Sequence, residues 1–464
     1  MRSTPEITLP LQLDRGAAGP LSAQLADHLR ALIADGVVAP GEAVPASRAL
    51  AAHLGISRGS VVVAYDQLLA EGYLSAVAGR STVVNPQLRR VHPRQRPPSA
   101  PQPAAAGPGL DLRPGRPWVS EVAGSAWRSA WRRASAEPVD VAVPALGLDA
   151  LRTAWADHLR RMRAVVRDPG QLAVTAGGRE GLATLLLTLG GRRPLRVGVE
   201  EPGYPSLRRV PARFGAQVVP LPVDRHGLRV ADLPVGAEAP DLLVITPSHQ
   251  YPLGGSLPVD RRQALLEWAR RHRVVVVEDD YDSELRYTSQ PLPALAALDD
   301  PADGRVVMLG TLSKTLAPAL AIGYLALPQW LVAGIAETRR DLGQPVGLVP
   351  QRAVAHYLES GALRLHTQRM RNRYRRRRAQ VLSALSGVDG LRVYPMDGGL
   401  HAVVETARPE AAVVATLRAA GVEVSPLSQY WTGTGTRPGI VFGFGAVDDE
   451  ELARGLAAIA AAAR

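Results

Sequence analysis

The chain has 464 residues, of which 46% are hydrophobic and 21% are charged, and its formal net charge is +11. This composition is ordinary for a globular protein and excludes wholesale disorder, and the length leaves room for roughly three domains. The N-terminal residues contain no apolar stretch of signal-peptide length and no run of about 18 apolar residues occurs, so we expect a cytoplasmic protein. The chain has no cysteine, which excludes disulfides, thiolate metal sites and a cysteine nucleophile, and we predict no metal site.

Residues 10–85 are predicted to form three short helices followed by a small hairpin. Apolar residues recur at helical spacing from Leu21 to Ile33, which indicates the first helix. The second spans Ser47 to Leu54 and stops at a glycine, and the third begins after Ser57, a good N-cap residue. A Gly-Tyr-Leu stretch and a further glycine then indicate a strand, a tight turn and a strand. This order is typical of a winged helix-turn-helix domain.

In such a domain the third helix enters the major groove of DNA, and its first residues face the bases. Here those residues are Ser57, Arg58, Gly59 and Ser60. Arg48, at the start of the second helix, and Arg80, at the tip of the wing, are placed to reach phosphates or a minor groove. Small three-helix units also serve as protein-interaction modules, so the pattern alone leaves both uses open.

The run VPASRALAAHLGISRGSVVVAYDQLLAEGYL resembles the GntR family of bacterial regulators. In that family a proline-led Ser-Arg opens the second helix, and Ser-Arg followed two residues later by Ser or Thr opens the recognition helix. The resemblance covers roughly 70 residues and implies that Arg48, Arg58, Ser60 and Gly79 contact DNA. The family often has an arginine within the recognition helix where this chain has Val62-Val63, so we expect fewer phosphate contacts.

Residues 86–108 are rich in proline and alanine, contain four arginines and have no acidic residue. This composition predicts an extended linker with polyproline stretches. Beyond the linker, residues 109–464 alternate strands with helical stretches. From about residue 350 the pattern becomes more helical and less regular, which indicates a smaller second lobe.

Continuous apolar runs in this large zone predict strands that are buried on both faces, and therefore a mostly parallel sheet. The runs are 172–175, 196–199, 242–246, 274–277 and 306–309. Ligand sites in such sheets lie beyond the carboxyl ends of the strands. The candidate cofactor-binding residues follow these runs: Gly177, Gly178, Arg179, Tyr204, Tyr251, Asp279, Tyr281, Thr311, Ser313 and Lys314.

Lys314 is the only lysine among 54 Lys and Arg residues. An arginine cannot replace a primary amine that must form a Schiff base, because guanidinium stays protonated and is a poor nucleophile. Lys314, with the other side chains, supplies what pyridoxal 5′-phosphate requires. Lys314 is the candidate catalytic residue and forms the Schiff base; Asp279 holds the pyridine nitrogen, Tyr281 reaches the ring oxygen and Tyr204 stacks on the ring.

This zone resembles fold-type I aminotransferases across its length, most clearly in TPSHQYPLG, EDDYDSELRY and GTLSKTLAPAL. Together with a GntR-like head and a Pro-rich linker, it is similar to the MocR group of transcriptional regulators. The resemblance implies an α/β fold with a mostly parallel sheet and a smaller C-terminal lobe, pyridoxal phosphate as cofactor, operator DNA as partner, and a homodimer. One branch of the group activates vitamin B6 synthesis genes and senses pyridoxal phosphate itself; others sense amino compounds through the bound cofactor.

Two positions depart from the pattern of the aminotransferase-like zone. The family usually has a phosphate-binding arginine where this chain has Ala321, and the phosphate turn reads Gly178-Arg179 where a hydroxyl or small residue and glutamine are usual. A lost charge-assisted contact would cost about 1.5–3 kcal/mol, or one to two decades of affinity. Arg179 is a candidate replacement for the missing charge.

Three functions compete at this point. The chain is a regulator that senses pyridoxal phosphate or its adduct with an amino compound, a working aminotransferase with a DNA-binding head, or a DNA binder that has lost the cofactor. We favour the first, because a DNA-binding head has no obvious use on a metabolic enzyme. The stretch 364–378, with eight arginines and no acid, is either a second DNA surface or a solvated helix.

Overall fold

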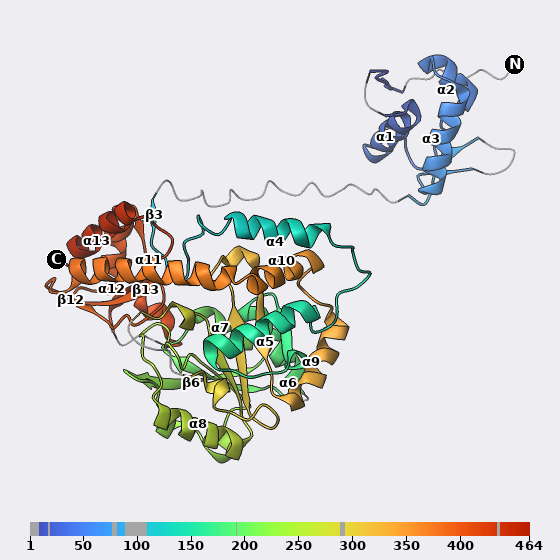
Figure 1. The fold of residues 1–464 in the computed structure, drawn as a ribbon. Helices are drawn as coiled ribbons and strands as arrows, with labels where there is room; N and C mark the ends of the chain where they lie inside the picture. The colour runs from blue at the N-terminus through green and yellow to red at the C-terminus, as the bar shows by residue number, and fades with distance from the viewer. Residues whose placement is uncertain are drawn as a thin grey trace, which may run out of the picture. The chain divides into compact units, whose positions relative to one another are not determined.

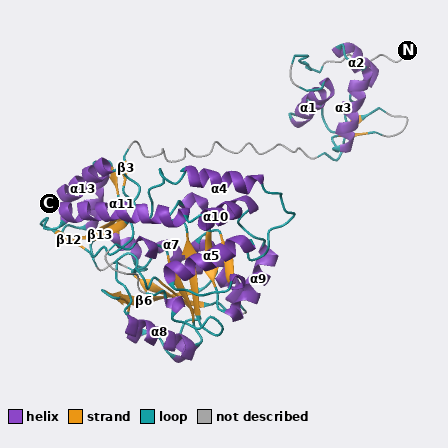
Figure 2. Cartoon of the chain, in the orientation of Figure 1, coloured by secondary structure: helices purple, strands orange, loops and turns teal. Residues whose placement is uncertain are grey.

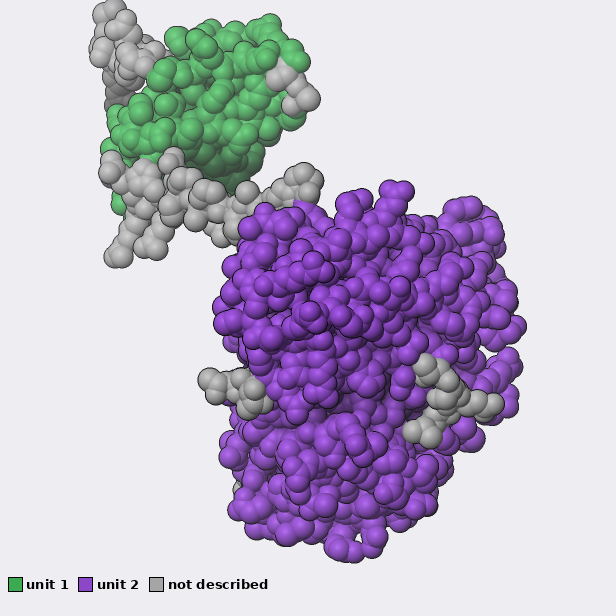
Figure 3. All heavy atoms as spheres, turned by 90° about the vertical axis from the view of Figure 1, so that its left-hand side faces the viewer, with its two compact units in different colours: residues 1–105 green, residues 106–464 purple. Residues whose placement is uncertain are grey.

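The computed structural model describes residues 9–16, 19–76, 81–88, 109–191, 193–287, 293–433 and 437–464. The chain divides into two compact units, residues 1–105 and residues 106–464, which Figure 3 colours separately. Among the described residues, no helix combines the length and the apolar character that crossing a membrane requires.

The described residues of the first unit form three helices and a two-stranded antiparallel sheet; Figure 1 shows the arrangement of the helices. Its elements are α1 (Leu21–Ala34), α2 (Ser47–Leu54), α3 (Arg58–Ala70), β1 (Leu74–Ser75) and β2 (Val83–Val84). Leu25, Leu29, Leu50 and Leu68 are fully buried and form the centre of its core. The helix bounds and the strand pair match the winged helix-turn-helix that the sequence predicts.

An eight-stranded sheet forms the middle of the second unit. In spatial order its strands are β4 (Leu172–Thr175), β11 (Gly323–Ala326), β10 (Val306–Thr311), β9 (Val275–Asp280), β8 (Leu242–Ile245), β5 (Arg196–Glu201), β6 (Gln217–Asp224) and β7 (Gly227–Leu228). Six strands are parallel, whereas β11 runs antiparallel between β4 and β10, and β7 runs antiparallel to β6. The mostly parallel sheet predicted from the apolar runs is confirmed.

Helices cover both faces of this sheet (Figure 2). One face packs against α5 (Asp149–Arg163), α8 (Val259–His272) and α10 (Leu348–Glu359), and the other against α6 (Gly178–Leu189), α7 (Pro205–Arg213) and α9 (Gln329–Leu342). Helix α4 (Ser125–Ala136) packs on α10. Successive residues of each strand point to opposite layers, so Leu172 and Val174 join the first core and Ala173 the second. Burial on both faces explains the continuous apolar runs.

The smaller lobe contains a four-stranded antiparallel sheet, which the expectation of a mainly helical C-terminal region did not include. Its strands, in spatial order, are β12 (Leu391–Val393), β13 (His401–Thr406), β16 (Gly439–Gly443) and β15 (Ser425–Pro426). It packs with α11 (Ala362–Leu385), α12 (Glu410–Ala419) and α13 (Asp449–Ala463). A separate parallel pair joins β14 (Val422–Glu423) to β3 (Leu110–Asp111). Both ends of the unit therefore contribute to this lobe.

We predict that Ser57→Ala lowers the free energy of unfolding of the first unit by about 1 kcal/mol. The Ser57 hydroxyl accepts a hydrogen bond from the Ser60 amide at 3.1 Å, and alanine removes this acceptor, which leaves that N–H only its bond to the Ser57 carbonyl. Thermal unfolding of the full chain, followed through the transition of the first unit, measures the loss. Ser57→Thr is the matched control and should retain most of the stability; equal losses in the two variants would contradict the capping role.

Candidate functional site

A cavity of about 340 Å³ lies at the carboxyl ends of the parallel strands of the second unit. All ten predicted cofactor-binding residues line it: Gly177, Gly178, Arg179, Tyr204, Tyr251, Asp279, Tyr281, Thr311, Ser313 and Lys314. They come from the ends of β4, β5, β8, β9 and β10 and the loops that follow. Parallel strands place these ends along one edge of the sheet, so residues far apart in sequence meet in one pocket.

Three successive acids on β9 have different surroundings. The carboxylate of Glu278 accepts the amides of Leu295 and Ala296, each at 2.9 Å. Asp280 forms a buried ion pair with Arg163 at 2.8 Å. Between them, Asp279 points into the cavity, and its carboxyl has no hydrogen-bond or ion-pair partner among the described residues. We expected Asp279 beyond the end of the strand, but β9 extends through Asp280 and the alternation of the strand separates the two side chains.

Burial, followed by the nearby carboxylates of Asp280 and Asp282, raises the pKa of Asp279 to about 8. Lys314 acts in the opposite direction and lowers this pKa. Only 6% of Asp279 is exposed, so a cation placed against its carboxyl would meet little competition from water. The pocket therefore holds an acid that lacks a hydrogen-bond or ion-pair partner in the part of the chain that the structure describes.

The Lys314 ammonium donates a hydrogen bond to the Gly115 carbonyl oxygen, and the nitrogen–oxygen distance is 2.8 Å. Gly115 has φ +94°, a conformation that favours glycine, and a Cβ atom there would lie 2.9 Å from the lysine nitrogen. Lys314 follows β10 in a loop, whereas Gly115 belongs to a segment 199 residues earlier. The structure thus assigns to the sole lysine a backbone partner that the sequence did not indicate.

Tyr281 belongs to a buried hydrogen-bonded group that the sequence analysis did not identify. Its hydroxyl donates to the His249 carbonyl oxygen at 3.1 Å and lies 3.0 Å from His249 Nδ1. His249 Nδ1 is 2.9 Å from Asp282 Oδ2. Burial, and next the Asp282 carboxylate, raises the pKa of Tyr281 well above its ordinary value. This group fixes the orientation of the hydroxyl and keeps it protonated.

Aromatic rings form another wall of the pocket. The Tyr251 ring lies 5.2 Å from that of Tyr204 and 5.6 Å from that of Tyr281, both edge-on. Its distance to the His401 ring is 4.6 Å. Burial, and then the nearby His249, lowers the pKa of His401 to about 4, so this imidazole is neutral at physiological pH. An aromatic ligand would meet ring faces and edges on this side.

Hydrogen-bond donors gather at the N-terminal end of α6. Gly177, with φ +89°, precedes the helix, whose first N–H groups have no partner within the helix. Thr311 and Ser313 bring two hydroxyls, 2.8 Å apart. Arg179 is exposed, lines the cavity and has no hydrogen-bond or ion-pair partner within the described ranges. Helix N-terminus, hydroxyls and guanidinium together suit a phosphate.

These observations fit pyridoxal 5′-phosphate. The unpartnered, buried Asp279 matches the cationic ring nitrogen, the amine of Lys314 matches the aldehyde, and the donors around Gly177 match the phosphate. Ala321 also lines the cavity, at the position where a further arginine was expected from the family pattern. It adopts φ +47° and supplies no charge. Arg179 is the one guanidinium among the lining residues described.

Buried groups around Glu200 were also not foreseen. The Glu200 carboxylate accepts the Thr246 hydroxyl at 2.5 Å and the Thr246 amide at 3.1 Å. Burial raises its pKa to about 7, and the bonds from Thr246 limit the rise. Thr246 and His249 lie in the TPSHQYPLG segment, and Asp282 lies in EDDYDSELRY. Their location within those two segments was the only sequence signal that pointed to these residues. The structure was needed to show which side chains pair.

The DNA-facing candidates lie on the first unit. Arg48, Ser57 and Arg58 are exposed, and Ser60 is half-buried at the first turn of α3. Arg58 Nε donates to the Ser47 hydroxyl at 3.4 Å, which joins the starts of α2 and α3. The remaining two candidates, Gly79 and Arg80, lie outside the described residues.

Helix α11 carries the eight arginines of the 364–378 stretch, and they are not equivalent. Arg377 is buried, donates to the carbonyls of Phe444 and Gly445 and pairs with Asp449. Arg373 pairs with Glu121. The exposed arginines of the helix are Arg364, Arg369, Arg375 and Arg376. Part of the stretch therefore stabilises the lobe, and only the remainder is a solvated basic face.

Two family models match the chain. The model of bacterial regulatory proteins of the gntR family matches residues 21–84, and that of aminotransferase class I and II matches residues 121–459. Together they cover the two compact units and leave the Pro-rich segment between them.

Relatives extend over nearly the whole chain. HTH-type pyridoxine biosynthesis transcriptional regulator PdxR of Corynebacterium glutamicum is 47% identical over 444 residues, which is 96% of each chain. Probable rhizopine catabolism regulatory protein MocR of Rhizobium meliloti is 32% identical over 470 residues, or 96% of this chain and 94% of that one. The crystal structure of Pyrococcus horikoshii kynurenine aminotransferase in complex with PMP superposes with a TM-score of 0.69 at 22% identity, over 76% of this chain and 90% of that chain. That likeness shows the fold of the second unit.

We predict that Asp279→Asn stabilises the ligand-free second unit, and that the gain grows between pH 4 and pH 8. A carboxyl whose pKa is raised on folding favours the fold at low pH and loses that contribution as pH rises through its folded-state pKa of about 8. The difference in free energy of unfolding should change by on the order of 1 kcal/mol per pH unit. Urea unfolding at several pH values measures it.

The neighbouring acid provides the control. Asp280→Asn breaks the buried pair with Arg163 and should destabilise the unit by about 3–5 kcal/mol. If Asp279→Asn destabilises the unit in the same way, Asp279 has a partner in the protein and is not the isolated acid of the pocket.

Proposed function

The chain belongs to the MocR group of regulators, which join a GntR-family head to an aminotransferase class I and II domain, and we propose that it is a DNA-binding transcriptional regulator that senses pyridoxal 5′-phosphate. One observation carries this proposal: Lys314, the only lysine of the chain, lines the same pocket as Asp279, which has no partner among the described residues. Identity of 47% to a pyridoxine biosynthesis regulator favours vitamin B6 synthesis genes as the regulated set.

Each part of the cofactor has a group to hold it. Asp279 would hold the protonated ring nitrogen. The Tyr281 hydroxyl, whose one hydrogen is donated to the His249 carbonyl in this structure, would turn that hydrogen to the ring oxygen. Tyr204 would stack on the ring, and Tyr251 would close the same wall. The phosphate would lie against the N-terminus of α6, with Arg179 and the hydroxyls of Thr311 and Ser313 as further donors.

Bound pyridoxal phosphate supplies an aldehyde that reacts with primary amines and a protonated ring that withdraws electrons. The protein's own groups prepare for this chemistry. Gly115 holds the Lys314 nitrogen in the cavity, and Asp279 keeps a negative charge available once a cation lies against it. His401 stays neutral and adds no competing positive charge beside the pocket. In this proposal the effector is pyridoxal phosphate itself or its adduct with an amino compound.

The first unit would bind operator DNA through the start of α3. Ser57 and Arg58 are exposed there, and Arg48 is exposed on the neighbouring helix. One small domain contacts few DNA phosphates and therefore binds DNA weakly at physiological salt. We therefore propose a homodimer that presents two DNA-binding units to repeated half-sites. We also propose that it acts in the cytoplasm. Residues 86–108 would then set the spacing between half-sites.

We predict that pyridoxal phosphate attaches to Lys314. Borohydride reduction of the saturated protein, followed by peptide mapping, should recover the adduct on this residue, and Lys314→Ala should abolish the visible absorbance band of the bound cofactor. Recovery of unmodified Lys314 from saturated protein would overturn the proposal. Loss of the band on mixing with a panel of amino acids would indicate a working aminotransferase.

We predict that Arg179→Ala weakens pyridoxal phosphate binding by about one to two decades, because it removes the one guanidinium among the described lining residues. Ala321→Arg should restore affinity in the Arg179→Ala background, since both positions line the same cavity. Titration of the absorbance band gives both dissociation constants. Unchanged affinity in Arg179→Ala would show that backbone donors and hydroxyls suffice for the phosphate.

We predict that two arginines of the first unit contribute differently to DNA binding. Arg58→Ala should cost about 1–3 kcal/mol and relax the preference at one base pair, because Arg58 opens the recognition helix. Arg48→Ala should weaken binding to all DNA sequences alike. It should also make the slope of log K against log salt concentration shallower by about one unit, which corresponds to the loss of one phosphate contact. Fluorescence anisotropy on matched and mismatched probes at several salt concentrations separates the two effects. Equal loss on all probes in both variants would contradict the assignment.

A further inference from the structure

Residues 109–118, which we call the strap, connect the Pro-rich segment to the rest of the second unit. The first part of the strap is fixed in the small lobe. Leu110 N donates to Gly421 O at 2.7 Å and Leu112 N to Glu423 O at 2.9 Å, in the β3–β14 pair. Gly443 of β16 donates to Leu112 O at 2.6 Å. These bonds make the beginning of the strap part of that lobe.

The middle of the strap reaches the cofactor pocket. Pro114 and Gly115 line the cavity, and the Gly115 carbonyl accepts the hydrogen bond from Lys314 Nζ at 2.8 Å. Lys314 belongs to the loop after β10 of the large sheet. This hydrogen bond therefore links the strap, which is anchored in the small lobe, to the large lobe.

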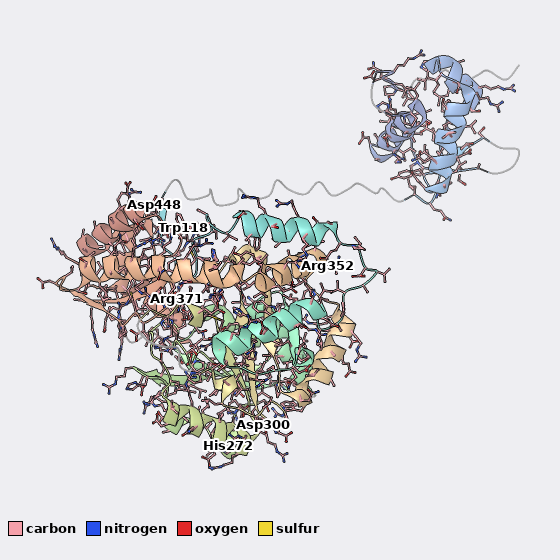
Figure 4. The ribbon with its side chains drawn as sticks, viewed as in Figure 1. Trp118, His272, Asp300, Arg352, Arg371 and Asp448 are labelled. Atoms are coloured by element: carbon pink, nitrogen blue, oxygen red, sulfur yellow. The ribbon has the colours of Figure 1, made fainter. Side chains whose placement is uncertain are left out.

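The end of the strap is held by α11. The backbone N–H of Trp118 donates to the Tyr374 hydroxyl at 2.9 Å. The guanidinium groups of Arg373 and Arg377 lie 4.4 and 5.1 Å from the centre of the Trp118 ring. Figure 4 labels Trp118 beside this helix. Tyr374 is fully buried in the core of the small lobe. The strap is thus fixed on both sides of Gly115.

Helix α11 also holds the lysine loop. His366, in the first turns of the helix, is fully buried, and its Nε2 donates to the Thr315 carbonyl at 2.9 Å. Thr315 follows Lys314 directly. The contacts form a closed circuit from Lys314 through Gly115, Trp118 and α11 back to Thr315. The Lys314–Gly115 bond is the one member of this circuit that depends on a reactive group.

We propose that the Gly115 carbonyl is the positioning group for Lys314 and that the strap transmits the chemical state of this lysine to the segment that carries the DNA-binding unit. This inference rests on the proposed function. Attachment of the Lys314 nitrogen to an aldehyde carbon forms a C=N double bond and releases one water, which leaves at most one N–H on that nitrogen. In this proposal that nitrogen no longer donates to Gly115, and the strap, which continues from β3, loses its hydrogen bond to the large lobe. Other contacts between the lobes, such as His366–Thr315, remain.

Spin-label distances test this coupling, and the absence of native cysteine makes labelling specific. One label is placed at Arg113→Cys in the strap, where Arg116 still pairs with Asp111, and the other at Arg270→Cys on α8. Labelled chains are diluted with unlabelled chains so that only distances within one chain are measured. Arg213→Cys with Arg270→Cys, both in the large lobe, is the control pair.

We expect pyridoxal phosphate to shift the strap distance by on the order of 1–2 Å, with the same midpoint as the absorbance band, and to leave the control pair unchanged. Pyridoxamine phosphate, which has no aldehyde, should leave the strap distance unchanged. Lys314→Met, which has no donor, should show the shifted distance without any cofactor. In Gly115→Ala, the added Cβ would crowd Lys314 Nζ. This variant should therefore also show the shifted strap distance without any cofactor.

The outcomes separate this inference from the proposed function. An absorbance band that forms without any change in the strap distance would overturn the coupling and leave the cofactor site intact. The coupling is also wrong if Lys314→Met and Gly115→Ala both keep the distance of the free protein. Absence of the band at saturating pyridoxal phosphate would overturn the proposed function, and the coupling with it.

Discussion

A carboxyl group taken out of water needs a partner, and the three acids of β9 show this constraint at one place in the fold. Glu278 has two backbone amides and Asp280 has Arg163, whereas Asp279 has no partner among the described residues and its pKa rises to about 8. The fold accepts an unfavourable acid at the centre of its cavity. Such an arrangement is reasonable when a cation arrives from outside, and the other lining residues are of the kinds that a phosphorylated pyridine requires.

Much of this site was predictable from sequence because its chemistry follows a simple geometric rule. Residues that follow buried parallel strands converge at one edge of the sheet. The ten candidates from Gly177 to Lys314 obeyed this rule and line one cavity. The single lysine in an arginine-rich chain narrowed the choice further, because only an amine could serve.

What remained hidden depends on contacts between distant segments. Gly115 lies 199 residues before Lys314, and His249 lies 33 residues before Asp282, so no local pattern connects either pair. Two strands of the small lobe were missed because they are short: β15 has two residues, one of them proline, and β12 has three with no fully buried position. The longer β13 and β16, with six and five residues, were also not predicted as strands. β11 was missed because its antiparallel direction breaks the strand–helix alternation on which the prediction relied.

If the proposals hold, the chemistry at Lys314 controls DNA binding by the first unit. The most direct measurement is the dissociation constant for a DNA probe selected from random sequence, with and without pyridoxal phosphate, for the native chain and for Lys314→Met. We predict that the cofactor changes the affinity of the native chain by roughly 5-fold to 150-fold, the usual range of coupling between sites, and leaves the variant unchanged. If pyridoxal phosphate changes the DNA affinity of both chains equally, or of neither chain, the chemistry at Lys314 does not control DNA binding.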